Sequence, residues 1–434
     1  MKVHLFGAAS SPGCANYGMK YLANQNKIEF PLAASFLQGD FYVDDGLIST
    51  ESTDDAIKLV KEVQTVCSKG GLHLHKFISN SREVMKAIPM SERASGIKNV
   101  DLSHDSLPIE RVLGIQWGVE SDTFKFHIQA KDQPPTRRGI LSTVASIYNP
   151  LGFLAPFILI GKRILQEMCR KNIGWDEPLS DNLRPIRDRW KADFENLKAV
   201  QVPRSYKPHD FGKILSTELH HFSDASTCGY GQCSYLRLVG ENRVHCTLIV
   251  GKTRVAPIKV VTIPRLELTA AIVSANMSHR LKEELNVNID GEYFWTDSQV
   301  VLGYIANEAR RFHVFIANKI QSIRHLSNCS QWYYVSSREN PADHTSRGVF
   351  ASELLDSNWF QGPKFLWERE LEIVEESTYE LNVGDPEVRN VTTFSAVTQE
   401  EPFNLETCMS RFSKWSGAVG ALARIKRVLR DRKE

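Results

Sequence analysis

The pattern of apolar and polar positions is clearest between residues 214 and 335, where its period changes several times. Two short apolar runs and an alternating run predict three strands, and a run of helical period follows them. A short apolar strand, two more helices and a last strand complete the series. The predicted elements are strands at 219–223, 229–239 and 244–250, a helix from 264 to 285, a strand at 293–296, helices from 298 and at 311–326, and a strand at 332–335.

The first 130 residues predict a smaller region of mixed helix and strand. An amphipathic helix at 53–68 carries an apolar stripe along one face. Before it, Phe41-Tyr42-Val43 favours a strand, and Asp44-Asp45-Gly46 favours a tight turn that returns through Leu47-Ile48. The other predicted elements here are a helix at 15–24 and strands at 72–77, 112–117 and 123–128.

Helical patterns occupy residues 134–199, after a boundary that Pro134-Pro135 marks. A proline-containing linker at 200–212 separates them from the strands described above. Beyond residue 352 the pattern fades. The segment 371–401 is acidic and rich in Ser and Thr, which favours a poorly ordered linker. Residues 411–430 then predict a basic amphipathic helix.

Composition narrows the class of protein without identifying one. The 434 residues are 42% hydrophobic and 24% charged, as in ordinary globular domains, and the formal net charge is +2. A basic surface for nucleic acid must therefore be local. The longest apolar run, 151–161, is shorter than the ~20 residues of a membrane helix. Eight cysteines without a C-x-x-C pair indicate reduced thiols, and no signal-peptide pattern is present, so we expect an intracellular protein, cytoplasmic or nuclear, that is not secreted.

Four carboxylates each stand beside one of the predicted strands or helices: Asp224, Glu267, Asp297 and Asp343. Carboxylates gathered at one place repel each other, which raises their pKa values. Divalent cations such as Mg²⁺ prefer oxygen ligands and neutralise such a cluster. The sequence therefore predicts a two-metal site that hydrolyses phosphodiesters. For any one of these acids taken alone, a helix cap or a turn is the better interpretation.

The order of these elements and acids resembles the RNase H fold, with its mixed five-stranded sheet and helices. The strings FSDAS, RLELTAA, FWTDSQVVLGYI and NPADHTSRG are similar to the retroelement version, and in particular to BEL/Pao-type LTR retrotransposon Pol polyproteins. The string TRRGILSTVASIYNPLGFLAPFILIGKRILQEM resembles the segment that follows the polymerase palm in that family, and FYVDD resembles the Y-x-D-D box of reverse transcriptases.

The resemblance implies an α/β and α+β multidomain chain. Its expected parts are the C-terminal part of a reverse transcriptase palm at 1–133, a helical thumb or connection at 134–199, an RNase H-like domain at 200–350, and a linker with a basic helix at 351–434 that precedes an integrase domain in the family. In that family an earlier palm strand and the fingers lie upstream of residue 6. We therefore expect Asp44 and Asp45 to be half of a polymerase metal site, and no DNA synthesis by this chain alone.

For the RNase H-like domain the resemblance implies a role for each of the four acids. Asp224, Glu267, Asp297 and Asp343 correspond to the catalytic and metal-binding carboxylates, which hold two Mg²⁺ (or Mn²⁺) ions. The implied substrate is the RNA strand of an RNA–DNA hybrid. Some family members carry a histidine shortly before the last aspartate. Here His344 follows that aspartate instead, so we do not expect a histidine to assist product release.

The remaining expectations concern partners. The candidate phosphate contacts are Arg137, Arg138, Lys162, Arg163 and Arg347, and the alternative for each is a solvated surface. Expected partners are an RNA–DNA hybrid or template–primer and other Gag or Pol products, with no membrane, although binding to a membrane surface or a protein is an alternative for the helix at 411–430. Two other functions stay open: reverse transcription with the missing palm supplied in trans, and a non-catalytic nucleic-acid-binding remnant.

Overall fold

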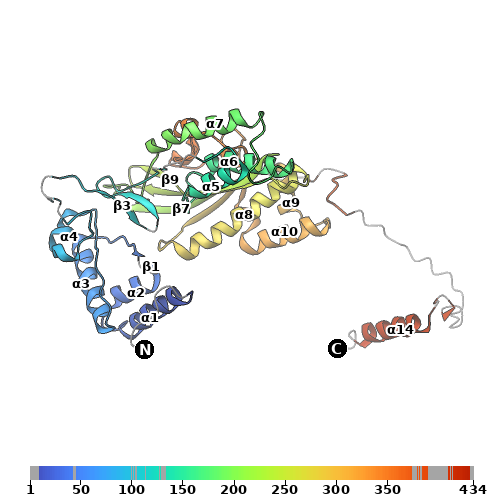
Figure 1. The fold of residues 1–434 in the computed structure, drawn as a ribbon. Coiled ribbons are helices and arrows are strands. Elements are labelled where there is room, and N and C mark those ends of the chain that lie inside the picture. The colour runs from blue at the N-terminus through green and yellow to red at the C-terminus, as the bar shows by residue number, and fades with distance from the viewer. Residues whose placement is uncertain are drawn as a thin grey trace. The chain divides into compact units, whose positions relative to one another are not determined.

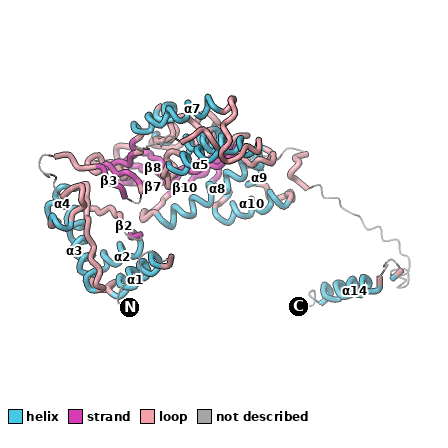
Figure 2. Tube along the Cα trace, in the orientation of Figure 1, coloured by secondary structure: helices cyan, strands magenta, loops and turns pink. Residues whose placement is uncertain are grey.

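The computed structural model describes residues 9–430 except 43–44, 99, 101, 103–104, 113, 127, 129–132, 374–378, 380, 382–383, 390–408, 411 and 413. The chain forms two compact units, Met1–Val388 and Arg389–Glu434. The first unit contains both helices and strands (Figure 2). No helix in the described part of the chain is both long and apolar enough to cross a bilayer.

A mixed five-stranded sheet is the centre of the first unit, as the sequence predicted. Its strand order is β11-β10-β7-β8-β9. The strands are β7 (Ile214–Ala225), β8 (Gly229–Gly240), β9 (Val244–Val255), β10 (Gly291–Thr296) and β11 (Trp332–Tyr334). The first three are antiparallel neighbours, whereas β10 runs parallel to both β7 and β11. The three long strands form hairpins, and the two short ones return through helices, as parallel connections require.

The central strand β7 is buried on both faces, so it lacks the alternation of a half-exposed strand. Phe222 and Trp295 belong to the core on one face, and Leu219 and Phe294 to the cores on the other. Helices α8 (Ile263–Glu284), α9 (Gln299–Ala306) and α10 (Val314–Leu326) pack on one side of the sheet, and α5, α6 and α7 lie on the other (Figure 1). The sheet is thus the middle layer of three.

The helices predicted at 134–199 pack directly on this sheet. They are α5 (Arg137–Ser146), α6 (Ala155–Arg170), α7 (Arg184–Ala192) and a 3₁₀ helix, η2 (Asp193–Ala199). Their core is continuous with that of the sheet, because Phe157 and Trp190 belong to the same buried cluster as Tyr235 and Leu248. The indole of Trp190 donates a hydrogen bond to the Phe157 carbonyl at 3.0 Å. Residues on both sides of position 200 therefore share one hydrophobic core.

A close backbone approach fixes the loop before α6 to the edge strand β9. Gly152 has φ +76°, and a Cβ there would overlap the carbonyl oxygen of Gly251. The Gly251 amide donates to the Leu151 carbonyl at 2.9 Å. The loop therefore covers part of the open edge of the sheet, and only glycine fits at position 152.

A buried polar network crosses the face of the sheet opposite α8. Glu218 accepts a hydrogen bond from Arg237 at 2.6 Å and contacts His220 at 3.2 Å. Trp295 donates to the other ring nitrogen of His220 at 3.1 Å. Arg237 also donates to the carbonyl of Leu366 at 2.9 Å, in the 3₁₀ helix η4 (Lys364–Trp367). The network therefore holds the segment after the last strand against β8.

The N-terminal elements differ in part from the prediction. Helix α3 (Thr53–Lys69) is confirmed, with Ser52 as its N-cap, and helix α1 (Ser11–Gln25) includes the predicted 15–24. Helix α2 (Pro31–Gly39) was not predicted. The predicted strand at 72–77 is wrong, because only an isolated bridge from Phe77 to Arg93 forms there. The other elements are α4 (Arg82–Ala87), η1 (Met90–Glu92) and a four-stranded sheet of β3 (Ile109–Val112), β4 (Ile115–Gly118), β5 (Thr123–Lys125) and β6 (Gln201–Pro203).

The predicted hairpin at 41–48 forms with a shifted turn. Strand β1 (Phe41–Tyr42) pairs antiparallel with β2 (Asp45–Gly46), so Asp45 lies in the returning strand opposite Tyr42. The expected turn at 44–46 is therefore wrong for Asp45 and Gly46. Asp44 lies outside the described residues.

The second unit contains helix α14 (Trp415–Arg430), which agrees with the helix predicted at 411–430. Its apolar residues Trp415, Val419, Leu422 and Ile425 are exposed. They recur at helical spacing and share one face of the helix.

Candidate active site

Two of the four predicted acids lie side by side at one end of the sheet. Asp224 is near the end of β7, and Asp297 follows directly on β10. The parallel register pairs Ser223 with Thr296, so the next residue on each strand is one of the two acids. Adjacent strands are about 4.8 Å apart, which makes these carboxylates neighbours.

The other two acids join them from helices. Glu267 lies just past the first turn of α8, and Asp343 is the first residue of α11 (Asp343–Arg347). The charge of Asp297 acts on Glu267, and the charges of Asp297 and Asp343 act on Asp224. The structure thus brings together all four acids, which are separated by up to 119 residues in the sequence (343 − 224).

The electrostatics of this group are those of crowded carboxylates. Asp224 is 6% exposed, and burial together with the charges of Asp297 and Asp343 raises its pKa to about 7, against a lowering contribution from the Ser346 hydroxyl. Burial is also the main reason why the pKa of Glu267 is raised. A carboxyl with a pKa near neutrality in a polar cluster is a candidate functional group.

Each acid has a hydrogen-bond donor, and of these four donors the sequence analysis named only Arg347, as a phosphate contact. Ser346 donates to Asp224, and Arg347 forms an ion pair with Asp343. The other two donors are Ser298 to Glu267 at 2.6 Å and Ser337 to Asp297 at 2.6 Å. Three of the donors lie within four residues of an acid in the sequence, in the strings TDS and DHTSR. The sequence therefore contains one signal for these donors, which is their position close to an acid.

Asn340 is a further residue that the sequence analysis did not single out. Its side-chain amide donates to the Ser223 carbonyl at 3.1 Å and to Asp297 at 3.3 Å. Its oxygen accepts from the Ala342 amide at 3.1 Å. Because it is 3% exposed, it has little freedom to turn. Asn340 therefore connects the ends of β7 and β10 to the loop that leads to Asp343.

The donor set suits hard divalent cations, because all four groups are carboxylates. Within the described residues, no three His, Cys, Asp or Glu side chains already converge as a metal-binding group. Each acid instead points an oxygen at a hydroxyl or guanidinium donor of the chain. Burial and, to a smaller extent, neighbouring carboxylates raise the pKa values of Asp224 and Glu267, and bound cations would favour the charged forms against both effects, so the residues fit Mg²⁺ or Mn²⁺.

The predicted phosphate contacts divide into two groups. Arg138 pairs with Asp176 at 2.8 Å, and Arg137 stacks on Trp175 with its guanidinium carbon 4.2 Å from the ring centre. Both arginines therefore hold the loop after α6. Arg163, on α6, donates to the carbonyl of Arg347 at 2.9 Å and so lies beside the acids.

Lys162 and Arg163 lie on the part of α6 that approaches the acids. A pocket of about 340 Å³ lies next to Arg163, with Gln166, Thr227 and Cys228 also in its lining. Thr227 and Cys228 belong to the turn between β7 and β8, which follows Asp224 closely. The helices before the sheet therefore form part of the surroundings of the acids.

His344 faces away from the acids. Its ring nitrogen lies 3.0 Å from the Asn358 side-chain oxygen, and its ring packs edge-on against Trp359. Of the predicted polymerase pair, Asp45 is exposed, and Asp44 lies outside the described residues.

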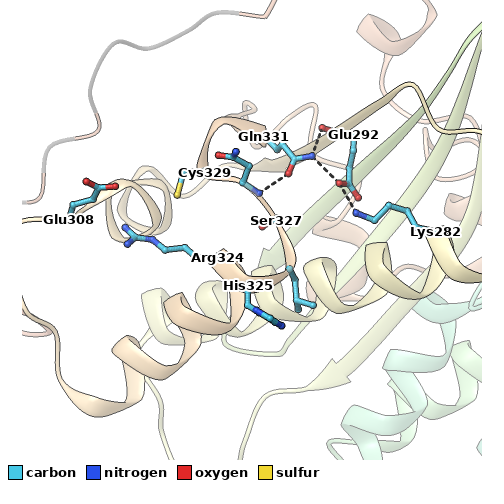
Figure 3. A pocket seen from close by; sticks show the side chains of 10 residues that line it. Lys282, Glu292, Glu308, Arg324, His325, Ser327, Cys329 and Gln331 are labelled. Atoms are coloured by element: carbon cyan, nitrogen blue, oxygen red, sulfur yellow. Dashed lines mark hydrogen bonds and ion pairs between the residues drawn. The ribbon is translucent and has the colours of Figure 1, made fainter. Parts of the chain in front are cut away.

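A separate polar pocket of about 580 Å³ lies near the opposite end of β10 from Asp297 (Figure 3). Its Glu292 accepts from Gln331 at 2.9 Å and pairs with Lys282 at 3.1 Å. Its Arg324 donates to the Asn307 carbonyl at 2.7 Å. Glu292 thus pairs with Lys282 and Gln331, and Arg324 is held by the backbone.

The sequence of residues 136–298 matches a family model described as "Pao retrotransposon-like RNaseH-like domain". The match runs from the start of α5 to the residue after Asp297, so it includes helices α5–α7 and strands β7 to β10. It confirms the resemblance to Pao/BEL retrotransposon Pol in this region. No curated protein sequence matches the chain significantly.

Solved RNase H structures are also similar to part of the chain. The N-terminal RNase H domain of a Mycobacterium tuberculosis protein, fused to maltose binding protein, is 14% identical over 32% of this chain and 95% of its own, with a TM-score of 0.22. RNase H1 from Halobacterium salinarum NRC-1 is 15% identical over 32% of this chain and 98% of its own, with a TM-score of 0.20. LC11-RNase H1 in complex with an RNA/DNA hybrid is 11% identical over 32% of this chain and 99% of its own, with a TM-score of 0.21.

Proposed function

Residues 136–298 are a Pao retrotransposon-like RNase H-like region, and we propose that this chain hydrolyses the RNA strand of RNA–DNA hybrids. The catalytic groups are Asp224, Glu267, Asp297 and Asp343. The observation that supports the proposal most is the gathering of these carboxylates at one end of the sheet, where burial and the charges of Asp297 and Asp343 raise the pKa of Asp224 to about 7. A structural role alone does not require buried carboxylates to be placed next to one another.

The same four side chains hold two Mg²⁺ or Mn²⁺ ions in this proposal. When bound, the ions activate the attacking water and stabilise the leaving oxygen of the phosphodiester. The chain itself supplies the geometry. Asn340 and Ser337 fix the orientation of Asp297, and Ser298 fixes Glu267 while it also caps α9 through the Val301 amide at 3.3 Å. Selection of RNA rests on its 2′-hydroxyl, which DNA lacks.

Hydrolysis of a labelled hybrid in Mg²⁺ by the purified full chain tests this function. We expect Asp297→Asn to lower the rate by at least about 100-fold, because removal of one carboxylate ligand weakens both metal binding and charge stabilisation. The matched control is Asp54→Asn, which changes the charge equally at an exposed position in the first turn of α3. Equal rates for wild type and Asp297→Asn, or no hydrolysis by wild type, would refute the proposal.

For residues 1–133 we keep the polymerase assignment as a second proposal, together with the expected boundary at 133/134. The pairing of Asp45 with Tyr42 in the hairpin β1–β2 supports this proposal. The test is extension of a primer on an RNA template, with and without an added palm and fingers fragment from the same family. Extension that disappears in Asp45→Asn would support it, and extension that persists would reject it.

A further inference from the structure

Four basic residues follow one another across the β9 edge of the sheet. We call them the β9 strip: Lys162 on α6, Lys252 and Arg254 on β9, and Arg280 on α8. Arg254 acts electrostatically on both Lys162 and Lys252, and Arg280 acts on Lys252, so each member is near the next. Helix α6 packs against β9, which brings Lys162 near residues that are 90 and 92 positions later (252 − 162 and 254 − 162).

The β9 strip begins close to the four acids. In the sheet register, Arg254 pairs with Tyr230, which pairs with Ala225, the neighbour of Asp224. Two strand spacings separate Arg254 from Ala225, which is roughly 10 Å between backbones. Lys252 lies two residues earlier on the same face of β9. The basic groups therefore extend outward from the acids along the edge of the sheet.

The charges of the β9 strip are not neutralised by the protein. Among the described residues, none of its four members forms an ion pair with a carboxylate, whereas Arg138 pairs with Asp176 and Arg347 with Asp343. Burial and the charge of Arg254 lower the pKa of Lys162, and burial and the charges of Arg254 and Arg280 lower that of Lys252. Arg254 and Arg280 are exposed. The chain as a whole carries a net charge of only +2, so this local excess is not a general property of its surface.

We propose that the β9 strip binds the sugar–phosphate backbone of the nucleic acid where it leaves the four acids. A row of cations without carboxylate partners beside the acids, with Arg254 and Arg280 exposed and Lys162 and Lys252 half-buried, fits a polyanion that carries one charge per ~1.7 Å of duplex axis. Long Lys and Arg side chains without fixed partners bind phosphates and do not read bases. The inference rests on the proposed function only in taking an RNA–DNA hybrid as the polyanion. It extends the expected contact at Lys162 to three residues that the sequence did not indicate.

The salt dependence of hybrid binding tests the β9 strip. The probe is a labelled RNA–DNA hybrid, and the full chain carries Asp297→Asn so that the hybrid is not cut. In this background we compare Lys252→Gln/Arg254→Gln/Arg280→Gln with a control that removes three cations elsewhere, Lys20→Gln/Lys27→Gln/Lys61→Gln. Three phosphate contacts contribute about 2 to 3 to the slope of log K against log salt concentration. We expect the slope of the first triple variant to fall by that amount. The slope of the control variant should equal that of the parent, the Asp297→Asn chain.

The possible outcomes separate the proposal for the β9 strip from the nuclease proposal. If the first triple variant has the same slope as the control and an unchanged circular dichroism spectrum, the proposal for the β9 strip is overturned. A reduced slope supports it even if the wild-type chain fails to hydrolyse the hybrid, and in that case only the nuclease proposal falls. Hydrolysis by wild type combined with an unchanged slope leaves the nuclease proposal standing without the strip. No binding of the hybrid at low salt by the parent overturns both.

Discussion

At the residue scale, the site depends on side chains that orient the acids as much as on the acids themselves. Sequence reasoning found Asp224, Glu267, Asp297 and Asp343 because each follows or precedes an apolar run. It did not find Asn340, because a single asparagine in a loop has the same local pattern as any turn residue. Only the fold shows that its amide spans β7 and Asp297.

Replacement of Asn340 should therefore impair catalysis more than binding. In Asn340→Ala, Asp297 loses a hydrogen bond and the loop to Asp343 loses its anchor. We expect the turnover rate to fall by about 10- to 100-fold, as for other residues that orient metal ligands. The affinity for the hybrid should stay within about threefold. The control is Asn276→Ala, whose amide bonds only to its own helix at Ile272. A loss of affinity equal to the loss of rate would contradict this role.

The raised pKa of Asp224 predicts a pH-dependent gain in stability when its charge is removed. Its folded pKa, about 7, lies above the ordinary value of 3.8, so the charged form destabilises the fold above pH 7. As the pH falls toward 4, the folded wild type takes up a proton and this penalty disappears. Asp224→Asn should thus be more stable than wild type by a few kcal/mol at pH 8, and by about zero at pH 4.

Urea unfolding in the presence of a chelator measures this difference, since bound cations would mask the repulsion. The control is Asp181→Asn, whose side chain is 97% exposed. It should change stability by less than about 0.5 kcal/mol at either pH. A gain for Asp224→Asn that is the same at pH 8 and pH 4 would contradict the assigned cause.

At the element scale, prediction succeeded where a segment's own pattern determines its structure. Strands β7 to β10 and helices α3 and α8 have clear periods and end signals, so their order could be read directly. The segment 72–77 alternates like a strand, yet it has no neighbouring strand with an open edge and forms only one bridge. Helix α2 is short and depends on burial of Phe36 and Leu37, which the sequence alone does not reveal.

The contact between the loop before α6 and β9 gives an element-scale prediction. Gly152→Ala combines a positive φ with overlap at the Gly251 carbonyl, whereas Gly212→Ala has φ +85° in open space. The backbone cost alone is about 1–2 kcal/mol, and the overlap adds about 1–3 kcal/mol at position 152. Urea unfolding should show Gly152→Ala as the less stable of the two. Equal losses of stability in the two variants would contradict this prediction, because they would mean that the loop before α6 moves away from β9 without cost.

At the scale of the whole molecule, helices α5–α7 and the five-stranded sheet form one core. The sequence suggested a division near residue 200 because a proline-containing linker lies there. The buried face of β7, with Phe222, and that of α6, with Phe157, could each be read as apolar. Their contact could not be read, because it joins segments that are more than 60 residues apart (222 − 157).

This shared core predicts the behaviour of fragments. Residues 109–388 retain both sides of the core, whereas residues 200–388 expose the face of the sheet that carries Phe222, Tyr235 and Trp295. We expect the longer fragment to unfold cooperatively in urea. The shorter one should aggregate or bind a hydrophobic dye, because a large exposed apolar surface promotes both. Cooperative unfolding of the shorter fragment with equal stability would contradict the single core.

The central claim is that the four acids form an RNA-strand-specific nuclease. The most direct measurement is hydrolysis of one RNA–DNA hybrid by the full chain in Mg²⁺, with the RNA or the DNA strand labelled in parallel reactions. We expect cleavage of the RNA strand alone, and its loss in Asp224→Asn. Cleavage of both strands, or RNA cleavage that survives in Asp224→Asn, would refute the proposed function.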